Sequence, residues 1–109
     1  MRRLLLLTAL AVVLFTGSAR AAYQVLGPGV VSCGTWTANR ASGRPDNWLA
    51  EGSWVLGFLS GVGYRGEGFD PLHGLDARAV AAWLDNYCRA HLFQDLAEAA
   101  AAFVREHPH

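Results

Sequence analysis

The chain contains no lysine, so its nine basic side chains are all arginines. Three of these arginines lie within the first 20 residues, whereas all nine acidic residues lie after residue 45. Residues 22–109 therefore keep six arginines against nine carboxylates, a net charge of −3 with neutral histidines. An acidic chain of this kind argues against nucleic acid or an anionic membrane as its partner.

Long apolar runs are also missing. The apolar stretch at residues 4–15 is too short to span a bilayer, which takes about 20 residues. It follows two arginines and precedes the sequence GSARAA, which offers an A-x-A cleavage site. This pattern predicts a secretory signal peptide over residues 1–21 and export to the periplasm, and no cysteine follows the run to make a lipoprotein anchor. Residues 22–109 are predicted to form one small domain.

Cysteine is scarce, with Cys33 and Cys88 as the two residues of this type. In an exported chain such a pair predicts a disulfide, and two cysteines allow one connectivity. Closing a loop of this length is worth about 4 kcal/mol in the chain-entropy model. A redox-active pair usually has C-x-x-C spacing, and no histidine lies near Cys33 to suggest a metal site.

Apolar residues recur at helical spacing in four segments, and no segment shows the alternation of a strand. The pattern predicts an all-α bundle with helices over about 33–41, 47–63, 77–91 and 93–106. The third helix begins after Asp76 as N-cap and carries Cys88 on its buried stripe.

Glycines interrupt the second of these helices, although glycine costs a helix interior about 1 kcal/mol relative to alanine. Gly57 and Gly61 are four residues apart and share a helix face. They are predicted to let a neighbouring helix approach closely, the one that carries Trp83 and Cys88.

Eleven aromatic residues follow residue 22, more than a small core easily buries. Trp54 and Phe58 lie at i and i+4, somewhat off the main stripe of the second helix. Two interpretations stay open. Either Trp54 and Phe58 form an exposed patch that binds a protein partner, or they widen the buried face of the helix.

Signals for catalysis or cofactors are weak. The four histidines are scattered, and two of them lie in the last three residues, which does not suit the converging ligands of a zinc site. Asp70, Asp76 and Asp85 fit loop, cap and surface positions, and the glycine-rich loop over residues 63–75 lacks the features of a phosphate loop. We therefore expect no enzyme, no metal and no cofactor, with a small enzyme or ligand carrier that uses this loop as a third hypothesis.

The layout resembles the HdeA/HdeB-like periplasmic proteins. The similarity rests on SCGTW (32–36), SWVLGFLSG (53–61), DARAVAAWLDNYCRAH (76–91) and LAEAAAAFV (96–104). It implies a small helical protein, often dimeric, in which one disulfide joins an early helix to a late one. It also implies an acid-stress chaperone that loosens at low pH and holds unfolded proteins.

A second resemblance is to the Tai-type immunity proteins, whose central helix is similar to WVLGFLSGV. It implies a periplasmic protein that neutralises an amidase toxin. The chain lacks the extra cysteines of that group, and its lack of lysine differs from the lysine-rich acid chaperones. Either way the function expected is non-catalytic protein binding.

Overall fold

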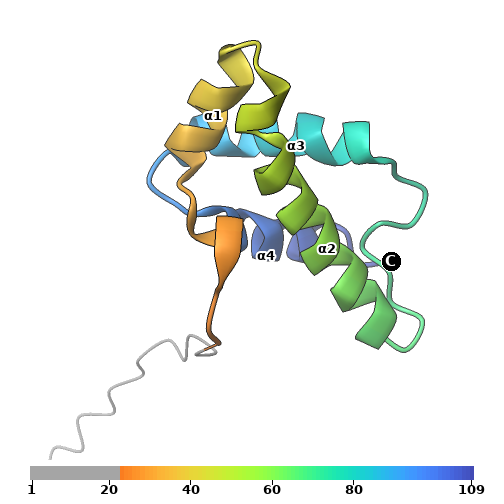
Figure 1. The fold of residues 1–109 in the computed structure, drawn as a ribbon. Helices are drawn as coiled ribbons and strands as arrows, with labels where there is room; N and C mark the ends of the chain where they lie inside the picture. Colours follow the sequence, from red (N-terminus) through yellow and green to blue (C-terminus); the bar gives the residue numbers. More distant parts are fainter. Residues whose placement is uncertain (1–22) are drawn as a thin grey trace, which may run out of the picture.

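The computed structural model describes residues 23–109, and the predicted signal peptide lies outside the described residues. The described chain is all-α, as predicted, and its elements are shown in Figure 1. Their bounds are η1 (Gly27–Val30), α1 (Cys33–Ala41), η2 (Pro45–Asn47), α2 (Leu49–Arg65), α3 (Ala77–Ala90) and α4 (Leu96–Glu106).

Side-chain caps fix where three of the helices begin. Ser32 accepts a hydrogen bond from the backbone N–H of Thr35 at the start of α1, and Asp76 does the same for Ala79 in α3. Asp95 and Glu98 form a reciprocal capping box at the start of α4. The box starts α4 at Leu96, so the prediction that this helix begins at residue 93 is wrong.

The start of α2 also differs from the prediction. The helix does not start at residue 47, because Pro45 begins a short 3₁₀ turn that includes Asp46 and Asn47. The helix starts after Trp48 and continues to Arg65, two residues past the predicted end at Gly63.

The predicted disulfide joins α1 to α3. The sulfur atoms of Cys33 and Cys88 are 2.14 Å apart, and both residues are fully buried. Around them lies one hydrophobic core to which all four α-helices contribute, with Trp36, Val55, Leu59, Leu84, Leu96 and Phe103 among its largest side chains. In this core α1 packs mainly on α3, while α2 packs on α4 and η1 (Figure 1).

A short backbone pairing ties the start of α1 to the start of α4. The N–H of Cys33 donates to the carbonyl of Gln94 at 2.7 Å, and the N–H of Leu96 donates to the carbonyl of Val31 at 2.9 Å. A third bond runs from the N–H of Gly34 to the carbonyl of Leu92 at 3.0 Å. These bonds and the disulfide hold residues 31–34 against the chain between α3 and α4.

The prediction that Gly57 and Gly61 admit a neighbouring helix is wrong. Both residues are exposed, and a Cβ added to either one would meet no other atom within 4 Å. The core face of α2 carries Val55 and Leu59, and a residue two positions further along a helix points to the opposite side. Trp83 does pack on a helix, but on α4, where its ring meets Phe103 edge to face at a centroid distance of 5.1 Å.

Replacing Gly57 and Gly61 with alanine is expected to stabilise the protein. Each alanine favours the helix by about 0.5–1 kcal/mol relative to glycine, and each Cβ points into open space. Thermal unfolding followed by circular dichroism should show a higher melting temperature for each variant and a nearly additive gain for the pair. A loss of stability in either variant would mean that a close contact does cover this face.

Candidate functional site

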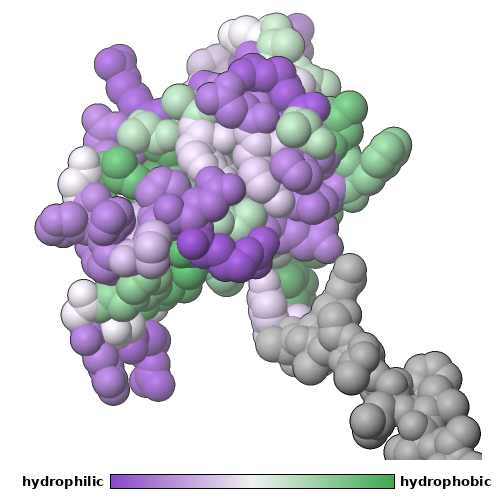
Figure 2. Space-filling model, turned by 180° about the vertical axis from the view of Figure 1, so that it is seen from behind, coloured by the Kyte–Doolittle hydropathy of each residue, from purple (hydrophilic) through white to green (hydrophobic). Residues whose placement is uncertain are grey.

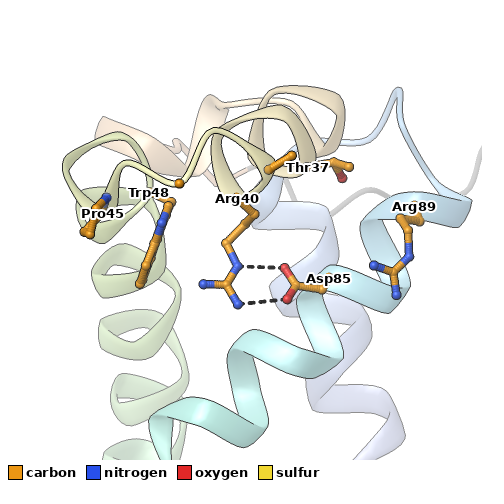
Figure 3. Close-up of a pocket in the computed structure, with 8 residues that line it drawn as sticks. Thr37, Arg40, Pro45, Trp48, Asp85 and Arg89 are labelled. Atoms are coloured by element: carbon orange, nitrogen blue, oxygen red, sulfur yellow. Dashed lines mark hydrogen bonds and ion pairs between the residues drawn. The ribbon is translucent and has the colours of Figure 1, made fainter.

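Arg40 of α1 and Asp85 of α3 form a two-pronged ion pair (Figure 3). Nε of Arg40 donates to Oδ1 of Asp85 at 3.0 Å, and one terminal nitrogen donates to Oδ2 at 2.9 Å. It is the only ion pair among the residues that the structure describes. The pair links the same two helices as the disulfide and lies seven residues from it along α1 and three residues from it along α3.

Two tryptophans enclose this ion pair. The Arg40 guanidinium carbon lies 4.6 Å from the ring centroid of Trp48 and 5.5 Å from that of Trp36. The indole N–H of Trp36 donates to Oδ1 of Asp85 at 3.0 Å. The hydrogen bond to Asp85 raises the pKa of Arg40 above its ordinary value, so the guanidinium stays charged at any physiological pH.

A groove extends from this pair along α3, on the side that faces α1, Trp48 and the start of α2. It consists of three adjoining hollows, of about 460, 390 and 130 Å³, that all include Trp48 in their walls. We call it the Trp48 groove and define it by Arg40, Trp48, Ala77, Arg78, Ala81 and Arg89. Ala77 and Ala81 leave space in the groove because their side chains are short.

The smallest hollow is the apolar end of the groove. It lies between α2 and α3, and its walls include Trp36, Leu56 and Leu84, with Ser53 as the one polar side chain among ten lining residues. Its volume of about 130 Å³ is close to that of an apolar cavity of about 150 Å³ that takes up a benzene ring. One large apolar side chain from a partner would fill it.

The charges along the groove are mostly positive. Three of the six arginines after residue 22 line it, namely Arg40, Arg78 and Arg89, on a chain segment with a net charge of −3. Asp85 is the one carboxylate among the lining residues, and it is already paired with Arg40. Figure 3 shows Arg89 on α3 beyond Asp85, with its guanidinium separate from the Arg40 pair.

A carboxyl group is buried where α1 meets the start of α2. Glu51 is 7% exposed, and its Oε1 accepts a hydrogen bond of 2.7 Å from the side-chain amide of Asn39. Its Oε2 has no hydrogen-bond partner within the described part of the chain. Burial raises the pKa of Glu51 above its ordinary value, and the hydrogen bond from Asn39 offsets part of that rise.

Glu51 should therefore stabilise the fold more at acidic than at neutral pH. Because its folded pKa lies above the unfolded value, its contribution is fully present below the unfolded pKa and is lost as the pH rises through the folded pKa. We expect the stability of the wild type relative to Glu51→Gln to increase as the pH falls from about 7 to 4. Urea unfolding at several pH values measures this difference. Parallel curves for the two proteins would show that Glu51 keeps an ordinary pKa.

The predicted aromatic pair lies away from the Trp48 groove. Trp54 and Phe58 are stacked with ring centroids 5.6 Å apart, and both are half-buried against the core. The indole N–H of Trp54 donates to the carbonyl of Leu26 at 2.9 Å, and its ring lies against Gly29 of η1. These positions fit the interpretation that the pair widens the buried face, and a role in binding a partner stays a prediction.

The most exposed aromatic side chain, Phe93, lies at a position predicted to be the start of the fourth helix. Phe93 lies in the connection between α3 and α4 and is fully exposed, and its neighbour Leu92 is 47% exposed. Figure 1 draws this connection on the left, which the half-turn of Figure 2 brings to the right, where apolar residues stand out at the edge. The D-x-x-E signature at Asp95 and Glu98 could have shown that Phe93 precedes the helix.

The other polar candidates have structural partners. Asp76 caps α3, and the rings of His91 and His107 each hydrogen-bond a carbonyl at the end of their helix. In the 63–75 loop, the N–H of Asp70 donates to the carbonyl of His109. Over residues 23–109 no three His, Cys, Asp or Glu side chains cluster closely enough to hold a metal ion. The expectation of a protein without catalysis, metal or cofactor stays a prediction.

None of the helices within residues 23–109 has the length and hydropathy of a bilayer-spanning segment. No protein-family model, curated protein or solved structure matches the chain. The similarity to the HdeA-like and Tai-type proteins therefore rests on the sequence motifs alone.

Proposed function

We propose that this protein is an exported, non-catalytic protein-binding protein that holds unfolded proteins under acid stress. The observation that carries the proposal is the exposure of Phe93 and Leu92 in the α3–α4 connection. A fully exposed phenylalanine beside a half-exposed leucine is typical of a contact surface for another protein. The disulfide keeps the chain joined around this surface when other contacts weaken.

Acid is the expected trigger because carboxylates hold several parts of the fold in place. Asp85 joins α3 to α1, Asp76 caps α3 and Asp95 caps α4. Protonation removes the charge that strengthens each of these bonds. Neutralising nine carboxylates while protonating four histidines would take residues 22–109 from −3 to about +10, given their six arginines. Such a charge favours an expanded state with more apolar surface exposed.

An aggregation assay tests the proposal. At about pH 2–3 the purified protein should suppress light scattering by an unrelated protein that unfolds in acid, and it should bind a hydrophobic dye. Replacing Leu92 and Phe93 with serine should weaken the suppression. Tyr64→Ser, which alters another highly exposed aromatic residue, is the matched control and should have little effect. A protein that stays compact in acid and leaves aggregation unchanged would rule out this function.

A second candidate is a periplasmic immunity protein, favoured by the Trp48 groove. The groove is present in the folded state, so it suits one specific partner at neutral pH better than a range of unfolded chains. This function predicts tight binding of one amidase toxin and inhibition of its activity at neutral pH. A toxin gene next to the gene for this protein would be an inexpensive first indication.

A further inference from the structure

The Trp48 groove combines an apolar hollow with arginines that have room for a partner. The hollow lies between α2 and α3 and is walled by Trp36 and Trp48. Beside it, Arg78 and Arg89 line the rest of the groove, and neither makes an ion pair within the described residues. The groove thus offers one apolar contact and two charged contacts along α3.

The geometry of α3 sets the spacing of these contacts. Arg78 and Arg89 are eleven residues apart, which corresponds to about 16 Å along the helix axis. Ala77 and Ala81 line the apolar hollow between α3 and α2, close to the Arg78 end. A partner segment would therefore place its apolar side chain nearer to the acidic group that pairs with Arg78 than to the one that pairs with Arg89.

The charge of the groove identifies the kind of partner. Arg40 is satisfied by Asp85 and stays in place over Trp48, so it shapes the wall rather than binding a new anion. Arg78 and Arg89 have no such carboxylate partner among residues 23–109, although Arg89 donates a hydrogen bond to Asn86. Carboxylates of a bound segment would supply the missing charge, with a bidentate geometry that suits arginine.

We propose that the Trp48 groove binds an acidic protein segment through one large apolar side chain, which enters the hollow beside Trp48 while flanking carboxylates pair with Arg78 and Arg89. The inference rests on the proposed protein-binding function and concerns the folded protein at neutral pH. Its site differs from the exposed surface around Phe93, so the two sites can succeed or fail separately.

The test uses a peptide of about 14 residues, long enough to reach from Arg78 to Arg89, with one phenylalanine flanked by glutamates. Its binding to the disulfide-bonded protein at neutral pH is followed by tryptophan fluorescence and by NMR shifts of the Trp48 indole. Peptides with alanine for phenylalanine, or with lysine for glutamate, should bind at least about tenfold more weakly. Equal binding of all three peptides would overturn the proposal.

Variants of the protein locate the site. Ala81→Leu should fill the apolar hollow, and Arg78→Glu with Arg89→Glu should reverse the charge, each with an affinity loss of at least about tenfold. Arg65→Glu, at the end of α2 and away from the groove, is the matched control for a change of charge. If Arg65→Glu weakens binding as much as the groove variants do, the attraction is nonspecific and the proposal fails. Circular dichroism confirms that each variant is folded.

Two further results separate this proposal from its alternatives. Sedimentation of the protein alone tests whether a second copy occupies the groove. A dimer that Ala81→Leu dissociates would overturn the proposal.

The acid aggregation assay on Ala81→Leu tests whether the acid function is independent of the Trp48 groove. Peptide binding by a wild type that fails the acid assay would support the groove and reject the chaperone function.

Discussion

Replacing both Cys33 and Cys88 with alanine is expected to leave most of the protein unfolded near 37 °C. The disulfide closes a loop with a sequence separation of 55 residues, worth about 4 kcal/mol in the chain-entropy model. Small domains have a total stability of about 5–15 kcal/mol, so the loss is a large share of it. Both cysteines are fully buried, so the variant also loses core packing between α1 and α3.

Thermal unfolding monitored by circular dichroism, with and without a reductant, measures this effect. The wild type should melt at a much lower temperature in reductant, and the double variant should melt low and be insensitive to it. Alanine is preferred to serine here because it adds no polar group to a buried site. A wild type whose melting temperature is unaffected by full reduction would show that α1 and α3 are held mainly by the other contacts.

Trp36→Ala should have a comparable effect, a loss of about 3–5 kcal/mol of unfolding free energy. Trp36 is almost fully buried in the core between α1, α2 and α3, and its ring is the nearest contact to the position of a Cβ at Gly52. Its indole N–H also donates to Asp85, the residue that holds Arg40. Removal of the ring therefore creates a cavity and loosens the ion pair at once.

Trp36→Phe separates these two contributions. Phenylalanine keeps much of the packing but cannot donate to Asp85, so the expected loss is about 1.5–3 kcal/mol, as for a single hydrogen bond to a charged group. Urea unfolding of both variants gives the two free energies. Equal losses for Trp36→Phe and Trp36→Ala would mean that the hydrogen bond, and not the ring volume, dominates at this position.

Local sequence signals were enough for most of the fold. The helical period placed α1 and, with the cap at Asp76, α3, and the cysteine count identified the one possible disulfide. These features depend on residues within a few positions of each other or on a pairing with no alternative. The start of α4 was equally accessible, because Asp95 and Glu98 form a capping box that the sequence displays.

Features that depend on how helices cross could not be obtained in this way. Spacing shows that Gly57 and Gly61 share a face of α2, but not whether another helix covers that face. In the same way, Arg40 and Asp85 are 45 residues apart, and nothing in the sequence selects this pair among the other charged residues. The Trp48 groove follows from these long-range contacts, so it emerges only from the structure.

The buried Glu51 bears on the proposed response to acid. Its protonation favours the folded state, so the contact between α1 and the start of α2 becomes firmer as the pH falls. Loosening in acid would have to begin elsewhere, at the Asp85 ion pair or at the Asp95 cap of α4. An acid-expanded state is thus expected to retain structure around Glu51 and to open first around α3 and α4.

The backbone pairing between residues 31–34 and 92–96 also has a consequence for local motions. Because the amides of Cys33 and Leu96 are bonded across segments about 60 residues apart in sequence, neither amide can be released by fraying of a single helix. Their hydrogen exchange should be among the slowest in the protein and should occur by global unfolding. The paired segments would then move as one cooperative unit, with the α3–α4 connection that displays Phe93 anchored to it.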